Sequence, residues 1–221
     1  MKRILLGLFT ISAVSMAADI NPTNIYLKTG IDLTSNVSTV KNDMLGSDMN
    51  KKKTKNYKGE VMLEGTQTIF SNVEVGLGVA SQRHGDLQTT DRYNGYFLPK
   101  LESIPVYLIG KYNIPVESGF KPYVFANLGY SFNDGKTSFT RTFAPGIYNR
   151  YNTEYKNGMY WAIGAGFELE NFLLDLSYKV NYGKLSYDFE LVNNGKKSSY
   201  SGNEKLNYGR VTLGFGYKFS F

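Results

Sequence analysis

The sequence predicts an all-β protein, a membrane-spanning, up-and-down antiparallel β-barrel of eight strands with short periplasmic turns and long extracellular loops. Three observations support this prediction. Apolar and polar residues alternate with period two from residue 24 onward. The connections between the alternating stretches are short and long in turn. The chain of 221 residues contains 18 Tyr, 14 Phe and 23 Gly, a composition that favours strands and tight turns over helices.

The amino terminus has the pattern of a secretory signal peptide. Lys2 and Arg3 precede an apolar run over residues 4–14, and small side chains stand at both ends of the three-residue segment 15–17 (Ser-Met-Ala). We expect residues 1–17 to be a cleaved signal peptide and residues 18–221 to form a single barrel domain. A membrane helix needs ~20 consecutive apolar residues, and no later run approaches that length, which excludes a helical bundle.

Each expected strand has one apolar face. In the last strand Val211, Leu213, Phe215 and Phe219 share a face, opposite Arg210 and the polar or small residues between them. A slip of one residue would exchange the two faces, so the pattern determines the register. The eight expected strands cover residues 25–33, 57–70, 73–83, 103–112, 121–132, 159–169, 172–182 and 210–221.

The connections fall into two classes. Residues 71–72 and 170–171 are two-residue turns, and residues 113–120 form a longer turn containing Pro and Gly. The long connections cover residues 34–56, 84–100, 133–157 and 183–206, and loops of this length usually carry function or are disordered.

The last long connection shows a pattern of its own. Leu185, Tyr187, Phe189 and Leu191 alternate with polar residues before Asn194-Gly195, a favourable hairpin turn. We expect this segment to project above the membrane as a ribbon. Its apolar positions are odd-numbered whereas Tyr182 is even, and a bulge near Gly183 would reconcile the two.

A secreted soluble β-sandwich would also alternate, and the polar face distinguishes it from a barrel. Here that face is rich in small residues, including pairs of glycines that suit a crowded barrel interior: Gly76 and Gly78, Gly164 and Gly166, Gly214 and Gly216. Aromatic residues also gather near the strand ends, as in membrane-interface girdles. They are Tyr57, Phe70, Tyr112, Tyr130, Trp161, Phe172, Tyr182, Phe219 and Phe221. Both features favour a closed barrel.

Residues 104–108 (Ile-Pro-Val-Tyr-Leu), Lys111-Tyr112, residues 121–124 (Lys-Pro-Tyr-Val) and residues 128–130 (Leu-Gly-Tyr) resemble the outer-membrane β-barrel domain family of small eight-stranded proteins, which includes opacity and attachment-invasion types. The carboxyl-terminal Gly216, Phe219 and Phe221 look like the signal that such barrels present to their assembly machinery. The resemblance implies a place in the outer membrane of a Gram-negative envelope, with function carried by the loops.

The strand pattern points charged residues of both signs inward. They are Lys28, Lys111, Lys179, Arg210 and Lys218 against Asp32, Glu60, Glu64, Glu74, Glu168 and Asp175. A selective pore would show a ring of one sign, whereas near balance favours paired charges that plug the lumen. Two alternatives stay open: a channel for small solutes, and a narrow cavity for a small apolar molecule beside the inward glycines.

The four long loops hold more Lys and Arg than Asp and Glu, and their densest basic cluster is Lys51, Lys52, Lys53 and Lys55. This cluster suits lipopolysaccharide phosphates or acidic host glycans, although it is equally consistent with a solvated loop. Nucleic acid is not an expected partner, because no stacking platform accompanies the charge.

Catalytic parts are few. The chain has no Cys, which excludes disulfides, thiolate metal sites and a lipid-bearing cysteine, and we expect no metal and no cofactor. His84 is the only histidine, with Ser81, Asp86 and Asp91 near it in sequence. Lipid A deacylases have a Ser two residues after their His, where this chain has Asp86, so a lipid-modifying enzyme is only a remote alternative.

We therefore expect a monomeric, non-enzymatic outer-membrane protein whose barrel anchors basic, Tyr-rich loops for adhesion or for contact with envelope lipid, host surfaces or matrix. The fold alone does not determine that function.

Overall fold

A computed structural model describes residues 23–38, 54, 58–86, 100–117 and 119–221. The expected signal peptide lies outside these residues. Among them, no helix is long and apolar enough to cross a membrane. The described chain forms two antiparallel sheets, one closed and one open.

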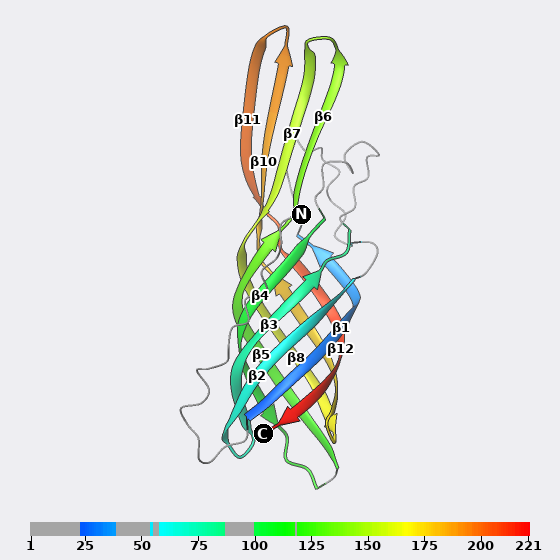
Figure 1. The fold of residues 1–221 in the computed structure, drawn as a ribbon, viewed down its shortest axis with the longest axis vertical. Coiled ribbons are helices and arrows are strands. Elements are labelled where there is room, and N and C mark those ends of the chain that lie inside the picture. Colours follow the sequence, from blue (N-terminus) through cyan, green and yellow to red (C-terminus); the bar gives the residue numbers. More distant parts are fainter. Residues whose placement is uncertain (1–22, 39–53, 55–57, 87–99, 118) are drawn as a thin grey trace.

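The closed sheet is the barrel, and its strands are neighbours in the order β1-β12-β9-β8-β5-β4-β3-β2 (Figure 1). Main-chain hydrogen bonds between Thr23 and Phe221 complete the seam between β1 and β12. Closure pairs the backbone of every strand on both sides, as the lipid interior requires. The strands are β1 (Thr23–Val37), β2 (Gly59–Phe70), β3 (Val73–Arg83), β4 (Glu102–Asn113), β5 (Phe120–Asp134), β8 (Gly158–Leu169), β9 (Phe172–Asn181) and β12 (Tyr208–Ser220).

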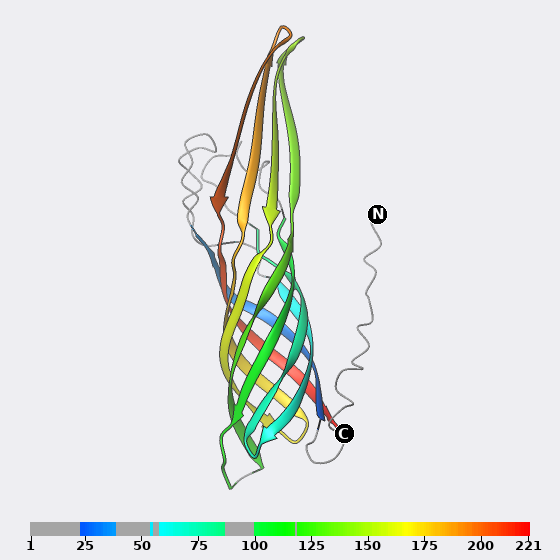
Figure 2. The same ribbon diagram turned by 90° about the vertical axis from the view of Figure 1, so that its left-hand side faces the viewer.

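The open sheet, called here the upper sheet, projects beyond one end of the barrel (Figures 1 and 2). Its order is β11-β10-β7-β6, from β6 (Lys136–Ala144), β7 (Ile147–Lys156), β10 (Lys184–Asn193) and β11 (Lys196–Lys205). The expected ribbon over residues 183–206 is confirmed, and its Asn194-Gly195 turn has positive φ at both residues.

The expectation that residues 133–157 form a loop without regular structure was wrong. They form the hairpin β6–β7, which turns at Gly146 with φ 79°. The sequence of this hairpin alternates weakly, and it becomes part of a sheet because β7 pairs along its whole length with β10. A partner distant in sequence therefore decides its structure.

The bulge expected near Gly183 is absent. Every odd-numbered residue from Leu173 to Tyr187 is buried, so the alternation continues unbroken from β9 into β10. The apolar face changes side because the surroundings change. Inside the membrane the outward face meets lipid and is apolar, whereas above the membrane the outward face meets water and the inward face carries the apolar residues.

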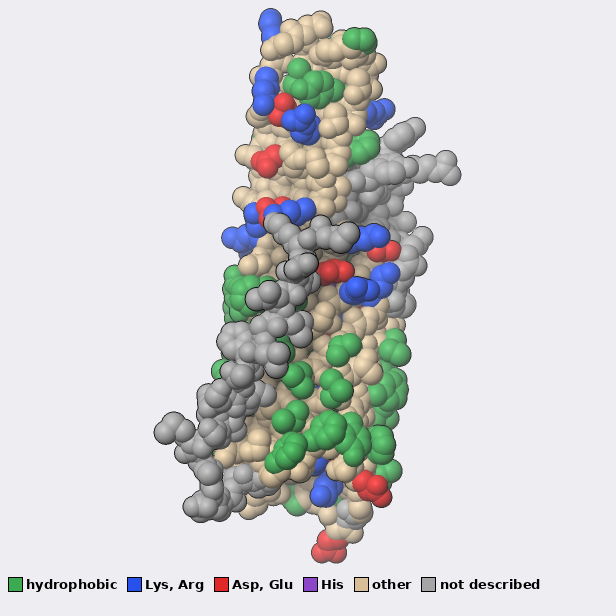
Figure 3. Space-filling view, in the orientation of Figure 1, with side chains coloured by type: hydrophobic (Ala, Val, Ile, Leu, Met, Phe, Trp, Pro, Cys, Tyr) green, Lys and Arg blue, Asp and Glu red, His purple; other side chains and the backbone are tan. Residues whose placement is uncertain are grey.

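The outward face of the barrel is an apolar belt. In the space-filling view, hydrophobic side chains are spread over the visible face of the barrel (Figure 3). Charged side chains gather at the lower end of the barrel, at the junction between the barrel and the upper sheet, and on the upper sheet itself. Along β9 and the residue after it, the belt runs from Phe172 to Tyr182, and ten steps of ~3.3 Å, tilted by ~40°, rise by about 25 Å, the height of a lipid-facing band. The barrel therefore crosses the membrane, with the upper sheet outside.

Candidate functional site

The barrel interior holds the eleven charged residues expected there. Ten of them are buried, and the side chain of Lys218 is 15% exposed near the lower end of the barrel. They form three groups stacked along the barrel axis, which we call the upper, middle and lower clusters. Their members are Asp32, Glu60, Lys179 and Arg210; Lys28, Glu64 and Asp175; and Glu74, Lys111, Glu168 and Lys218.

The upper cluster is electrically balanced around Glu60. Arg210 approaches Glu60 at 2.6 Å, Lys179 pairs with the other carboxylate oxygen, and Gln82 donates a hydrogen bond at 2.9 Å. Asp32 lies 3.5 Å from Arg210. Two acids and two bases thus neutralise one another where neither reaches solvent.

The middle and lower clusters use tyrosine hydroxyls as additional donors. Lys28 lies 3.0 Å from Asp175 and 3.4 Å from Glu64, and Tyr107 donates to Glu64 at 2.9 Å. In the lower cluster Lys111 bridges Glu74 and Glu168. The middle cluster has two carboxylates and one base. The hydroxyls of Tyr107 and Tyr123 donate hydrogen bonds to the two carboxylates, which stabilises the negative charge that Lys28 alone does not neutralise.

Large side chains fill the space beside the inward glycines. A Cβ on Gly164 would lie 2.6 Å from the ring of Phe125, one on Gly214 would lie 2.5 Å from Asp175, and one on Gly216 would lie 2.6 Å from Lys28. Between the middle and lower clusters a cavity of about 10 Å³ remains, lined in part by Tyr26, Lys28 and Lys111. That volume holds about one water molecule. Gly164, Gly214 and Gly216 therefore leave room for neighbouring side chains.

His84 is buried at the upper mouth of the barrel, not exposed as a lone loop histidine usually is. Its Nε2 lies 2.7 Å from the hydroxyl of Ser103, a residue 19 positions away that no local sequence pattern links to it. Burial, followed by the positive charge of Arg210, holds the pKa of His84 well below its usual 6.5. Of its expected partners, Ser81 is exposed, Asp86 is half-buried, and Asp91 lies outside the described residues.

The direction of the hydrogen bonds at Ser103 defines the role of this pair. Asn133 donates its amide protons to the carbonyls of Lys156 and Tyr182, so its oxygen must accept, and Ser103 donates to it at 2.8 Å. Ser103 therefore accepts a hydrogen bond from the Nε2–H group of His84. A nucleophilic serine needs the opposite arrangement, in which the histidine takes the hydroxyl proton.

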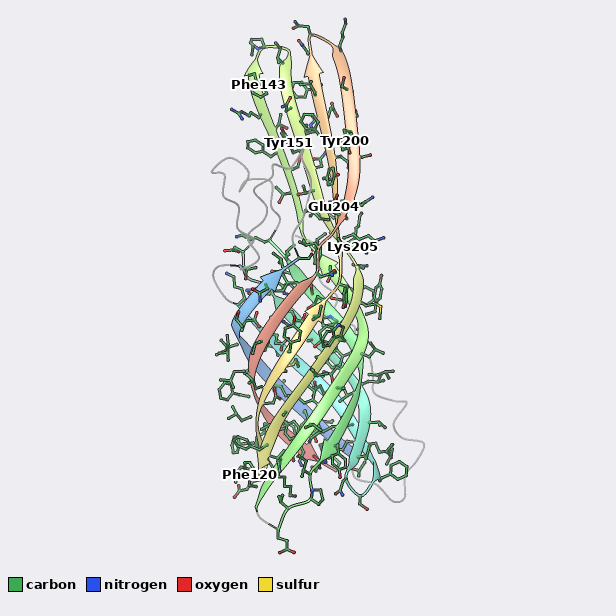
Figure 4. The ribbon with its side chains drawn as sticks, turned by 180° about the vertical axis from the view of Figure 1, so that it is seen from behind. Phe120, Phe143, Tyr151, Tyr200, Glu204 and Lys205 are labelled. Atoms are coloured by element: carbon green, nitrogen blue, oxygen red, sulfur yellow. The ribbon has the colours of Figure 1, made fainter. Side chains whose placement is uncertain are left out.

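The inward face of the upper sheet carries an aromatic row across all four strands. Phe139 lies opposite Tyr151, Tyr151 opposite Phe189, and Phe189 opposite Tyr200. The rings of Tyr151 and Phe189 are 4.8 Å apart, and Tyr200, which is 48% exposed, stacks on Tyr187. Figure 4 shows Tyr151 and Tyr200 within the upper sheet, with Phe143 near its tip. We call Phe139, Tyr151, Phe189 and Tyr200 the aromatic row.

The outward face of the same sheet is polar. A groove of about 730 Å³ there is bordered by Ser138, Asn152, Asp188 and Ser201. Nearer the barrel, hydrogen bonds from Lys136 and Lys156 lower the pKa of Glu154 below its usual 4.5. The two faces of the sheet therefore offer chemically different surfaces.

The remaining predicted site residues lie elsewhere. Phe219 faces lipid, Phe221 is 78% exposed at the lower rim, and the space beside Gly216 is filled by Lys28. The basic loop cluster of Lys51, Lys52, Lys53 and Lys55 lies outside the described residues.

Comparison with known proteins agrees with this architecture. The family described as "Outer membrane protein beta-barrel domain" matches residues 4–219. The uncharacterized protein PM1543 of Pasteurella multocida (strain Pm70) is 29% identical over 217 residues, covering 87% of this chain and 90% of that protein.

Solved structures of similar fold include outer-membrane protein OprG of Pseudomonas aeruginosa, with a TM-score of 0.48, 14% identity and coverage of 90% of this chain and 95% of that chain. The attachment invasion locus protein Ail of Yersinia pestis, solved with the heparin analogue sucrose octasulfate, has a TM-score of 0.46, 15% identity and coverage of 91% and 100%. Neisserial surface protein A has a TM-score of 0.43, 10% identity and coverage of 89% and 97%. This chain belongs to the outer-membrane β-barrel domain family and resides in the bacterial outer membrane.

Proposed function

We propose that this protein is a surface-binding protein, an adhesin in which the barrel anchors the upper sheet and presents the aromatic row to a ligand on a host cell or in the extracellular matrix. The observation that carries the proposal is the upper sheet itself. It extends the wall formed by β5, β8, β9 and β12 beyond the membrane, so the binding surface is held by continuous strands.

The composition of the inward face supports binding. Aromatic residues and arginine are enriched in the cores of protein interfaces, and tyrosine in particular buries much area at a small cost in conformational entropy. All four positions of the aromatic row are tyrosine or phenylalanine, and one of them, Tyr200, is exposed. Nearer the tip, Arg141 lies over the ring of Phe143.

The filled lumen supports a surface function over a channel. Three stacked clusters of ion pairs occupy the described interior, and a conducting pore needs a continuous water path with sites that ions can leave. Purified protein in planar bilayers is therefore expected to give no discrete conductance steps. Regular steps would favour the channel alternative.

We also assign His84 a structural role at the mouth of the barrel. It is buried and donates to Ser103, whose own proton is directed to Asn133. This arrangement supports a non-enzymatic protein.

The test compares two double variants that lie next to each other in sequence but on opposite faces. Tyr151→Ser with Tyr200→Ser removes half of the aromatic row, and Asn152→Ser with Ser201→Ala changes the polar face as a matched control. Bacteria carrying the first variant are expected to bind host cells and immobilised matrix as weakly as bacteria lacking the protein, whereas the control binds like the parent. Equal binding by both variants, at equal surface levels, would refute the proposal.

A further inference from the structure

Three lysines lie side by side on the outward face where the upper sheet leaves the barrel. Lys184 of β10 is directly opposite Lys156 of β7 on one side and Lys205 of β11 on the other. Directly opposed residues of neighbouring strands point to the same face, with Cβ atoms about 5 Å apart. The pairing therefore places three ammonium groups in one row. We call Lys156, Lys184 and Lys205 the lysine row.

Like charges placed opposite one another destabilise a sheet unless something compensates them. Lys156 shares Glu154 with Lys136. Among the described residues, no carboxylate forms an ion pair with Lys184 or Lys205. The row therefore keeps an excess of positive charge at its Lys184–Lys205 end.

The position of the lysine row relative to the apolar belt indicates which ligand it can reach. Two residues before Lys184 on the same face lies Tyr182, whose hydroxyl accepts a hydrogen bond from the indole of Trp161 at 3.3 Å. Met159, on β8 just below Lys156, is 56% exposed among the lipid-facing residues. Going from the barrel toward the upper sheet, the apolar belt comes first, then the pair of Trp161 and Tyr182, and then the lysine row. The same order in a membrane is hydrocarbon core, interface and lipid headgroups. Figure 4 places Lys205 where the upper sheet meets the barrel.

Hydrogen bonds from one side chain join the backbone segments beneath the row. The side-chain amide of Asn133 donates to the carbonyl of Lys156 at 3.0 Å and to that of Tyr182 at 3.2 Å, which joins the last residue of β7 to the residue that follows β9. The lysines consequently project from fixed positions, and binding needs only their side chains to become ordered.

We propose that the lysine row binds the phosphate groups of lipid in the outer leaflet, the phosphates of lipid A. An anion bridging Lys184 and Lys205 removes their mutual repulsion, and a lipid phosphate reaches this level while its acyl chains pack against the apolar belt. The site would fix the height of the barrel in the membrane and hold the upper sheet above it. It is separate from the aromatic row, which lies on the other face of the sheet.

The test uses two variants that each remove two positive charges. Lys184→Gln with Lys205→Gln removes the uncompensated end of the lysine row, and Lys196→Gln with Lys197→Gln removes two lysines near the tip as the control. Folded protein in detergent is titrated with bisphosphorylated lipid A, and bound lipid is counted by native mass spectrometry. The first variant is expected to weaken binding by roughly tenfold or more, whereas the control retains the parent affinity.

Two further arms distinguish the source of the anion. Dephosphorylated lipid A is expected to bind the parent and the first variant equally weakly. A soluble sulfated oligosaccharide is expected to bind both with equal affinity. If the first variant lost the oligosaccharide and kept lipid A, or if both variants bound lipid A like the parent, the proposal would be wrong. A closed barrel that resists detergent migrates differently on a denaturing gel before and after boiling, and this heat-dependent gel shift is the check that each variant is folded.

Discussion

Replacement of Glu60 by Gln tests how the barrel interior is stabilised. Glu60 neutralises Arg210 and Lys179, whose side chains are at most 2% exposed. The substitution keeps the size of the side chain and removes one negative charge, which leaves two buried cations facing Asp32 alone. Because breaking a buried ion pair from one side strands the other charge, the free energy of unfolding should fall by about 3–5 kcal/mol.

The assay is urea unfolding of protein folded into lipid vesicles, followed by the gel mobility of unboiled samples. Glu102→Gln is the matched control, because Glu102 pairs with Arg83 at 3.4 Å with both side chains more than half exposed. An exposed pair of this kind contributes about 0–1 kcal/mol.

A second variant separates charge from packing. Glu60→Gln combined with Lys179→Met restores the balance of charge, and the new side chain would lie beside Met62, which Lys179 already contacts at 3.3 Å. This double variant should recover much of the lost stability. If Glu60→Gln were no more destabilising than Glu102→Gln, the interior would be solvated enough to screen the charges, and the argument for a plugged lumen would fail.

Three further predictions follow from the structure. Deletion of Phe221, which removes the main-chain pair with Thr23 and the terminal aromatic ring, should lower the folded outer-membrane fraction on gels of unboiled membranes; unchanged levels would show that this residue is not the assembly signal. Because burial depresses the pKa of His84, its contribution to stability is present above pH 6.5 and is lost as the pH falls through the depressed value. The protection of amides against hydrogen exchange near residues 84–86 and 101–103, after correction for the intrinsic pH dependence of exchange, should therefore fall on acidification, and His84→Gln should abolish that dependence. Removal of β6–β7, with residues 136–156 replaced by a short turn, should leave the heat-dependent gel shift intact and increase exchange in β10, which loses its partner; loss of the barrel itself would contradict the independence of the two sheets.

The barrel could be predicted from the sequence because the information is local. A strand exposes one face to lipid and the other to the lumen, and this requirement recurs every two residues within a single segment. The pattern of Phe172 to Asn181 alone therefore places Asp175 and Lys179 inside and Leu176 outside. The same reasoning identified the β10–β11 hairpin from its alternation and its Asn194-Gly195 turn.

The partners of each buried charge depend on strands that are far apart in sequence. Lys179 meets Glu60 across 119 residues, and His84 meets Ser103 on the neighbouring strand. The alternation along each strand predicts that both groups face inward. It does not predict at which height along the barrel axis they meet, because that height depends on the stagger of every strand around the barrel. The lysine row was missed for the same reason, since Lys156, Lys184 and Lys205 adjoin only once β7, β10 and β11 are paired.

The sequence by itself determined which residues face lipid and which face the lumen, since that choice repeats along each strand. Only the tertiary structure decided that residues 133–157 become strands and that the apolar face changes sides from β9 to β10 without a bulge. It also decided which acid neutralises which base. These outcomes depend on the pairing of distant strands and on the position of the membrane surface, and neither is written in a local pattern.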